Sequence, residues 1–356
     1  MTLRIGLVGA QFIGNLYLHS MRKVQGGEVV AVASPNSAEE FAGRWGIERH
    51  YKDYRSMIED CELDAVAIAA PNDLHYDVCL AAADAGKHVL CEKPLALSLE
   101  EADTIIAACK RAGVVLMYGE NLLFAPMYVR LRELARRGKV GDPFLVKQAQ
   151  CHGGPYSTWF WDVERAGGGA LMDLGCHSIH AICWTLGMWP EAVSATLGQF
   201  AHGAKTDAED HAEVTLHFPG GLIGMAEASW AMPGGLDYLE VYGTQGRLTA
   251  NLERGPAIAM YAAAGEEATG PAHREPAWQY PMYEEAWQFG FEQELQHFVD
   301  VCAGREELQS TGEDGRRVLE IIFAAYESAR LGRRVELPFW STAEKAIDLW
   351  RETIGE

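Results

Sequence analysis

The stretch LRIGLVGAQFIGNLYLHSMRKV, residues 3–24, decides the fold of the first third of the chain. It opens with a short apolar run that is rich enough in β-branched residues to form a buried strand. The turn GAQFIG, residues 9–14, then leads into residues 15–24, whose spacing is helical. A strand that turns on glycine into a helix predicts the start of a βαβ unit.

The same alternation continues as far as residue 120. Further strand-like runs lie at residues 28–34, 64–71, 88–94 and 114–120, and helical runs lie at residues 37–46, 73–86 and 99–113. Strands that alternate with helices of this length predict right-handed crossovers and a parallel, doubly wound sheet. Such a sheet binds its ligand at the carboxyl ends of its strands.

Length and charge limit the class of protein. At 356 residues, two domains are expected. The net charge of −20 argues against nucleic acid and against an anionic membrane surface as partners. The eight cysteines are scattered without a C-x-x-C pair, and no apolar run has transmembrane length. We therefore expect a soluble, cytoplasmic protein with reduced thiols.

The first strand–helix turn is a candidate dinucleotide site. Gly9 and Gly14 occupy the first and third glycine positions of G-x-G-x-x-G, but Gln11 occupies the second. Gln11 adds a side chain where the backbone normally approaches the phosphates. Taken alone, the turn fits an ordinary strand–helix connection as well as a dinucleotide site.

Ser34 ends the second strand, where an Asp or Glu normally holds the adenine ribose. Its hydroxyl is able to hydrogen-bond a ribose hydroxyl or a 2′-phosphate. Pro35 and Asn36 follow, so no adjacent Arg supplies a countercharge. The cofactor is therefore NAD or NADP, and the missing Arg favours NAD.

Two later strand ends carry polar side chains at the predicted ligand-binding edge. They are APNDLH, residues 70–75, and CEKP, residues 91–94. A lone Lys in a loop is usually a surface residue. Lys93 instead ends a buried strand, which places it beside a cofactor, and Pro94 is suited to fixing the turn.

The run GGGALMDLGCHSIHAI, residues 167–182, has the character of a buried helix but contains Asp173 and His177. Positions four apart share one helix face. They form either a structural pair, with the acid favoured near the helix start, or a catalytic pair with imidazole as base. We interpret His180 as a core residue.

Several motifs resemble one known family. They are the glycine turn, PNDLH, CEKPL, GGGALMDLGCHSIH, VYGTQGRL and TGEDGRR, in the family's order over nearly the whole chain. The sequence resembles the glucose-fructose oxidoreductase, inositol dehydrogenase and rhizopine-catabolism (Gfo/Idh/MocA) family of sugar and cyclitol dehydrogenases. The most specific part is EKP followed about eighty residues later by D-x-x-x-H.

The resemblance implies a Rossmann domain, residues 1–121, followed by an α+β domain with a large, mostly antiparallel sheet, residues 122–356. The second domain is expected to bind the substrate and to form a homo-oligomer, a dimer or tetramer. No metal is implied.

The resemblance also assigns roles to matching residues. Lys93, Asp173 and His177 match the catalytic residues. The cofactor-binding residues that it implies are Gly9, Gln11, Phe12, Ile13, Ser34, Pro71, Asn72, His75, Glu92, Lys93 and Asn121. The stretch GENLLF, residues 119–124, departs from the family's more common basic sequence.

These residue types suit the oxidation of a secondary alcohol. Nicotinamide takes the hydride, and the protein takes the proton and stabilises the developing oxyanion. His177 is the expected base. Asp173 is expected either to bond a substrate hydroxyl or to orient the imidazole, and Lys93 to donate to the reacting oxygen.

The loop before this helix, residues 152–169, combines aromatic and charged side chains. It is either a substrate-binding loop, with aromatic faces against sugar C–H groups, or a packing loop that covers the core. The candidate substrate-binding residues are His152, Tyr156, Trp159, Trp161 and Arg165, with Tyr283 as a weaker one.

Three functions are compatible with these features. The first is an NAD(P)-dependent dehydrogenase or reductase of a carbohydrate or cyclitol. The second is a glycoside-cleaving enzyme that retains NAD and oxidises the sugar only transiently. The third is a non-enzymatic cofactor-binding regulator, against which the presence of Lys93, Asp173 and His177 argues, because a sensor does not need them.

Overall fold

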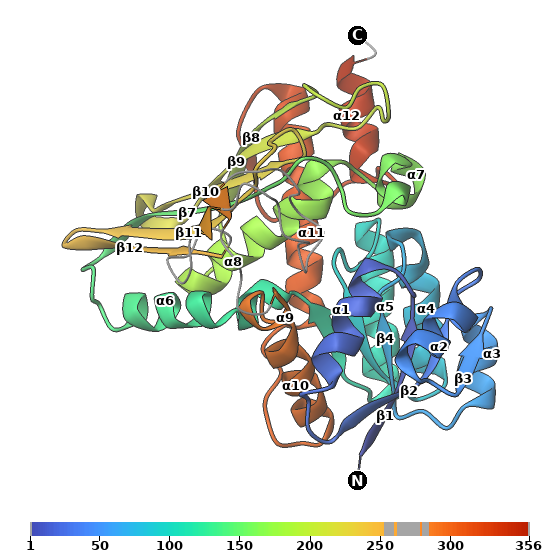
Figure 1. The fold of residues 1–356 in the computed structure, drawn as a ribbon. Helices are drawn as coiled ribbons and strands as arrows, with labels where there is room; N and C mark the ends of the chain where they lie inside the picture. The colour runs from blue at the N-terminus through green and yellow to red at the C-terminus, as the bar shows by residue number, and fades with distance from the viewer. Residues whose placement is uncertain (1, 253–259, 262–277, 280–284, 355–356) are drawn as a thin grey trace.

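The structure is a computed structural model that describes residues 2–252, 260–261, 278–279 and 285–354 (Figure 1). Tyr283 lies outside these residues. Among the described helices, none is both long and apolar enough to cross a lipid bilayer.

The N-terminal domain is built on a parallel sheet of six strands. The strands are β1 (Leu3–Val8), β2 (Gly27–Ala33), β3 (Arg49–Tyr51), β4 (Ala65–Ile68), β5 (His88–Glu92) and β6 (Leu116–Gly119). Their order is β3-β2-β1-β4-β5-β6. The chain reverses direction across the sheet between β1 and β4, which is where doubly wound sheets bind ligands. The predicted Rossmann fold is confirmed.

The helices of this domain are α1 (Phe12–Met21), α2 (Ala38–Trp45), α3 (Tyr54–Asp60), α4 (His75–Asp84) and α5 (Leu99–Ala112). The ends of α5 follow from its sequence. The Ser98 side chain accepts a hydrogen bond from the Glu101 amide at the start, and Gly113 ends the helix in a left-handed conformation with φ of 67°.

The C-terminal domain contains a sheet of seven strands, in the order β12-β11-β7-β10-β9-β8-β15. These strands are β7 (Pro143–Cys151), β8 (Ala192–Gly198), β9 (His211–His217), β10 (Ile223–Ser229), β11 (Leu236–Gly243), β12 (Gly246–Asn251) and β15 (Val335–Glu336). Only the β7–β10 pair is parallel among these neighbours. The predicted mostly antiparallel sheet is confirmed.

One face of this sheet is covered by helices (Figure 1). The helices are α6 (Pro126–Arg136), α8 (Cys176–Leu186) and α11 (Gly312–Leu331). The sequence of β9 explains why the helices cover this face. Ala212, Val214 and Leu216 alternate with polar residues, so their apolar side chains lie on one face of the strand and are buried. The remaining short elements are α7 (Val163–Ala166), β13 (Met260–Tyr261), β14 (Trp278–Gln279), α9 (Glu285–Gln288) and α12 (Ala346–Ile354).

A late helix, α10 (Phe291–Cys302), packs back against α1 of the Rossmann domain (Figure 1). Leu295, Phe298 and Val299 share one buried core with Ile5 and Leu7 of β1. The core of the N-terminal domain is therefore completed by residues near position 300. The division of the chain at residues 121/122 stays a prediction.

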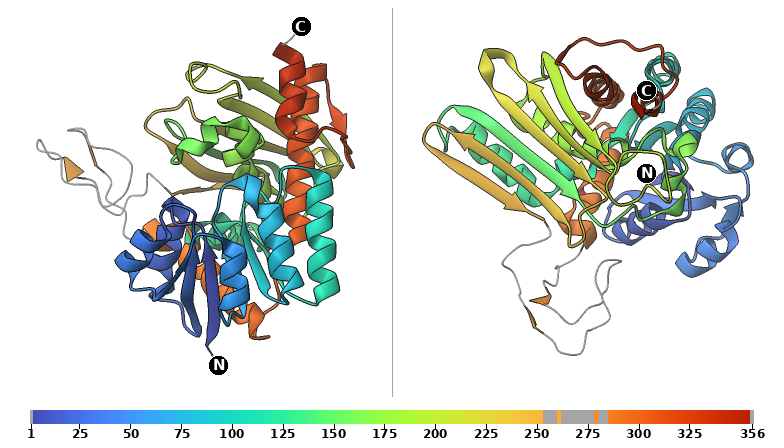
Figure 2. Two further views of the ribbon diagram at one scale, coloured as in Figure 1. Left: turned by 90° about the vertical axis from the view of Figure 1, so that its right-hand side faces the viewer. Right: turned by 90° about the horizontal axis from the view of Figure 1, so that it is seen from above.

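Helix α11 also joins the two domains, because it lies along both β8 and α5 (Figure 2). Just before it, Ser310 donates to the carbonyl of Tyr118 at 2.7 Å, and Thr311 forms a bridge with Met117. These contacts cover the free edge of β6.

Replacing Phe298 by Ala tests the contribution of α10 to the Rossmann domain. The side chain is 0% exposed, so its removal leaves a cavity and should cost about 3–5 kcal/mol of stability. Phe200→Ala is the control, because Phe200 is 74% exposed. Scanning calorimetry should show a lower unfolding temperature for Phe298→Ala alone; equal temperatures for both variants would contradict the assignment.

Candidate active site

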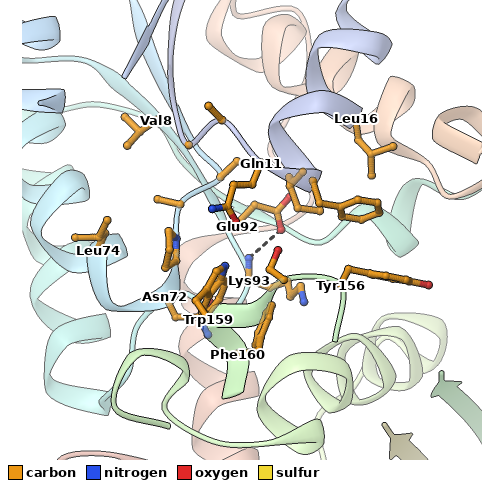
Figure 3. Close-up of a pocket in the computed structure, with 18 of the residues that line it drawn as sticks. Val8, Gln11, Leu16, Asn72, Leu74, Glu92, Lys93, Tyr156, Trp159 and Phe160 are labelled. Carbon is orange, nitrogen blue, oxygen red and sulfur yellow. Dashed lines mark hydrogen bonds between the residues drawn. The ribbon is translucent and has the colours of Figure 1, made fainter. Parts of the chain in front are cut away.

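A cleft of about 510 Å³ lies at the carboxyl ends of the Rossmann strands. One wall comes from the loops after β1, β2, β4 and β5, and the other from residues 150–165 and the start of α8. Figure 3 shows Gln11 and Glu92 on the Rossmann side, facing Tyr156, Trp159 and Phe160 of the loop after β7. The cleft thus lies where the topology predicts a ligand.

Most of the predicted site residues line this cleft. They are Gly9, Gln11, Phe12, Ile13, Ser34, Pro71, Asn72, Glu92, Lys93, Asn121, His152, Tyr156, Trp159, Arg165, Asp173 and His177. Two do not. His75 is buried, with Nδ1 2.7 Å from the Pro94 carbonyl and Nε2 3.0 Å from that of Ala70, so it ties two strand-end loops together. Trp161 packs edge-on against Trp230.

The glycines of the first turn are required by close packing. Gly9 has φ of 111°, and a Cβ there would stand 2.1 Å from the Ala69 carbonyl oxygen. A Cβ on Gly14 would stand 2.7 Å from the Gly9 carbonyl oxygen. Gln11 precedes α1 without capping it through its side chain, so the first amides of α1 are available to an anion. The turn fits a pyrophosphate.

The end of the cleft next to β2 and β3 contains charges of both signs. Ser34 lines it as predicted, with its hydroxyl 2.9 Å from that of Ser37. Lys52 and Asp53 also line it. Sequence reasoning missed them because they follow β3, the neighbour of β2 in the sheet, and are distant from Ser34 along the chain.

Lys93 and Asp173 form an ion pair between the two domains. The Lys93 ammonium lies 2.8 Å from Asp173 Oδ1 and 2.8 Å from the Asp173 carbonyl. Trp230 donates from Nε1 to Asp173 Oδ2 at 3.0 Å. Burial alone would raise the pKa of Asp173, but Lys93 and the two hydrogen bonds bring it below its usual value. Asp173 is thus a carboxylate at neutral pH.

His177 is held by a residue that sequence reasoning missed. Its Nδ1 lies 2.6 Å from Oε1 of Glu120, which follows β6. The expectation that Asp173 orients the imidazole is wrong, because both Asp173 oxygens are directed at Lys93 and Trp230. Asp173 lies in a π-helical turn, Leu171–Gly175, which changes the alignment expected of an α-helix. In the sequence, the unusual GENLLF stretch, residues 119–124, was the only feature that pointed to Glu120.

His180 does not line the cleft. Its ring contacts those of Tyr118 and Trp189, at centroid distances of 5.7 and 6.1 Å, and the residue is buried. This is the position of a core residue.

The loop after β7 both packs and lines the cleft. Tyr156 stacks on Phe12 at 4.9 Å and lies 4.6 Å from the His152 ring. Phe160, which was not predicted, stacks on Trp159 at 3.8 Å. The loop therefore reaches across from the second domain to the cofactor turn.

Arg165, the predicted sugar contact, forms an ion pair at the rim of the cleft that it lines. Its guanidinium pairs with Asp73 at 3.2 Å, and the neighbouring Asn72 donates to the Ala166 carbonyl at 2.9 Å. Both contacts join the loop after β4 to α7. Arg165 thus ties the domains together at the rim of the cleft.

One cluster has metal-ligand residue types. Ligand atoms of Glu120, Cys176 and His177 lie within 4.8 Å of one another. However, Glu120 and His177 are hydrogen-bonded to each other, and the Cys176 thiol donates to the Asp173 carbonyl. Burial raises the pKa of Cys176 well above its usual value. Because metals bind the thiolate, this cluster disfavours one.

Family models match most of the chain. Residues 3–120 match the oxidoreductase family with an NAD-binding Rossmann fold, and residues 128–249 match the GFO/IDH/MocA C-terminal domain. The chain belongs to the Gfo/Idh/MocA oxidoreductase family.

Individual relatives agree with this assignment. Myo-inositol 2-dehydrogenase of Thermotoga maritima is 28% identical over 346 residues, which is 94% of this chain and 98% of the relative. The crystal structure of GenD2 from gentamicin A biosynthesis in complex with NAD has 32% identity and a TM-score of 0.89, covering 95% of this chain and 97% of that one.

A levoglucosan dehydrogenase in complex with NADH and levoglucosan has 28% identity and a TM-score of 0.80, covering 95% of this chain and 100% of that one. This Gfo/Idh/MocA protein is therefore an oxidoreductase of a family that acts on sugars and cyclitols. The hypothesis of a non-enzymatic cofactor-binding regulator is thereby set aside. The hypothesis of a glycoside-cleaving enzyme is not favoured.

Lys93→Met should destabilise the enzyme in a pH-dependent way. Removing one partner of a buried ion pair costs about 3–5 kcal/mol, because the other charge stays buried. In the wild type, Asp173 contributes stability that is lost only as the pH falls through its lowered pKa. In the variant, burial should raise the pKa of Asp173. Protonation of Asp173 at lower pH then removes the unpaired buried charge and with it most of the destabilisation.

The loss in melting temperature should therefore be larger at about pH 7.5 than at about pH 5. Lys110→Met is the control, since it removes an exposed pair with Glu313 that is worth at most about 1 kcal/mol. A Lys93→Met deficit that is equal at both pH values would show that the buried charge is not its cause.

Proposed function

We propose that this enzyme transfers a hydride between a secondary alcohol of a sugar, sugar derivative or cyclitol and NAD or NADP. The observation that carries the proposal is the convergence of Lys93 from the Rossmann domain with Asp173 and His177 from the second domain on one cleft. Nicotinamide, when bound, supplies the hydride acceptor.

The cofactor is proposed to lie along the Rossmann wall of the cleft. The first turn, with Gly9, Gln11, Phe12 and Ile13, would hold the pyrophosphate. Ser34 would bond the adenine ribose. The remaining cofactor-side residues, proposed for the nicotinamide half, are Pro71, Asn72, Glu92, Lys93 and Asn121.

His177 is proposed to take the alcohol proton. Its Nδ1 is engaged by Glu120, so Nε2 is the nitrogen left for substrate. An ammonium has three donors, and Lys93 directs two bonds to Asp173, which leaves one for the reacting oxygen. Asp173 keeps that ammonium charged and in place.

The substrate is proposed to lie against the loop after β7. Tyr156, Trp159 and Phe160 offer aromatic faces of the kind that pack on the C–H groups of sugar rings. His152 lines the same wall. Myo-inositol and levoglucosan are the first substrates to test, because relatives act on or bind them.

The face of the second sheet opposite α6, α8 and α11 is proposed to join subunits of a homo-oligomer. Ile223 and Met225 of β10 are 39% and 43% exposed there. In register beside them on β7 lie Leu145 and Lys147. Such a mixture of apolar and polar side chains is typical of subunit interfaces. Sedimentation measures the assembly directly.

His177→Ala should lower turnover by about 10²–10⁴-fold, since that is the usual contribution of general acid–base catalysis. NAD affinity should hardly change, because His177 belongs to the second domain. Reduction of NAD and NADP with myo-inositol and levoglucosan would be followed by absorbance, and cofactor binding by calorimetry. A folded variant with near-normal turnover would remove His177 from the mechanism.

Ser34→Asp should weaken NADP binding by about tenfold or more, because a carboxylate repels the 2′-phosphate. NAD binding should be retained, since Asp bonds the ribose diol. Lys52→Met is a second probe: loss of this cation should also affect NADP more than NAD. A wild type that already excludes NADP as strongly as Ser34→Asp would show that Ser34 is not the selector.

A further inference from the structure

Glu120 is the buried carboxylate that contacts the proposed base. Its side chain is 0% exposed, and its Oε1 lies 2.6 Å from His177 Nδ1. Within the described part of the chain, its Oε2 has no hydrogen-bond partner. The contact joins the Rossmann edge strand β6 to the first turn of α8.

The charge of Glu120 is set by its surroundings. Burial would raise its pKa, but protonated His177, through its charge and its hydrogen bond, brings the pKa below the usual value, with smaller contributions from His180 and Lys93. The other titratable groups near this pair are Glu92 and Lys93 on or after β5, Tyr118 on β6, His152 after β7, Cys176 and His180 on α8, and Glu294 on α10. The 2.6 Å contact between Oε1 and His177 Nδ1 is as short as a charge-assisted hydrogen bond, and on this geometry we assign Glu120 as a carboxylate.

An ionised carboxylate only accepts hydrogen bonds, so the hydrogen of neutral His177 must lie on Nδ1. The lone pair is then on Nε2. We propose that Glu120 is a positioning residue that holds His177 in this tautomer and stabilises the imidazolium that forms during turnover. The proposal rests on the proposed function, in which His177 takes the substrate proton.

The oxidation of the alcohol needs no further proton acceptor. The alcohol O–H proton moves to His177 Nε2, and the carbon-bound hydride moves to the cofactor. The Nδ1 hydrogen stays on the imidazole and keeps its bond to Glu120. The buried pair changes from a net charge of −1 to zero, which low-dielectric surroundings favour.

Glu120→Gln tests the proposal with nearly unchanged shape. The new amide is able to donate to Nδ1, which would move the hydrogen to Nε2 and block the base. Turnover of myo-inositol or levoglucosan, whichever the wild type oxidises, should fall by about 10²–10⁴-fold, with NAD affinity unchanged. Glu120→Asp, which retains the charge, should recover part of the loss.

Glu294→Gln is the matched control. Glu294 is also fully buried, but burial and the nearby Glu92 and Glu120 raise its pKa well above the usual value. It is therefore neutral, and its replacement by Gln keeps the charge. Its turnover should stay near that of the wild type; an equal loss in both variants would assign the effect to packing and overturn the proposal.

A second measurement does not need the substrate. Nitrogen-15 NMR of the NAD-bound protein, with His177 assigned by its absence in His177→Gln, should show hydrogen on Nδ1 in the wild type and on Nε2 in Glu120→Gln. A wild type protonated on Nε2 would overturn the proposal even if the variant does not fold. Failure to oxidise any sugar or cyclitol, with the expected tautomer, would instead contradict the proposed function.

Discussion

The ion pair between Lys93 and Asp173 is the constraint on which the site depends. Lys93 directly follows β5 of the Rossmann sheet, and Asp173 precedes α8, which packs on the second sheet. Their 2.8 Å contact therefore fixes the distance between the two walls of the cleft. The two side chains are only 11% and 7% exposed, so removing either one would leave the other charge largely buried and unpaired. The same contact places an ammonium at the carboxyl end of a strand and brings His177, one turn further along, to the cleft.

The sequence was sufficient for features that depend on neighbours in the chain. The glycine turn, the alternation of strands and helices, and Lys93 at a strand end all follow from short-range patterns with a known physical meaning. Gly9 illustrates this, since only a residue without a Cβ fits 2.1 Å from the Ala69 oxygen. Ser34 lines the cleft because of its position after β2, a local feature that the sequence also shows.

Features that depend on distant contacts were not predictable. Glu120 and His177 are 57 residues apart, as are Asp173 and Trp230. A helical repeat predicted that Asp173 and His177 share a face, but a π-helical turn separates their directions and gives each a different partner. The ion pair of Arg165 with Asp73, 92 residues away along the chain, was likewise not foreseen. Each case was decided by a side chain that no local pattern specifies.

The return of α10 to the Rossmann domain has a consequence for how the protein is made. During synthesis, the six strands of the first sheet leave the ribosome long before Leu295 and Phe298 are available to cover α1. The nascent N-terminal half therefore carries an open apolar surface until most of the chain is complete. A fragment that ends near residue 121 would retain that surface. The part of the chain that contains the glycine turn is therefore not expected to form a stable domain by itself.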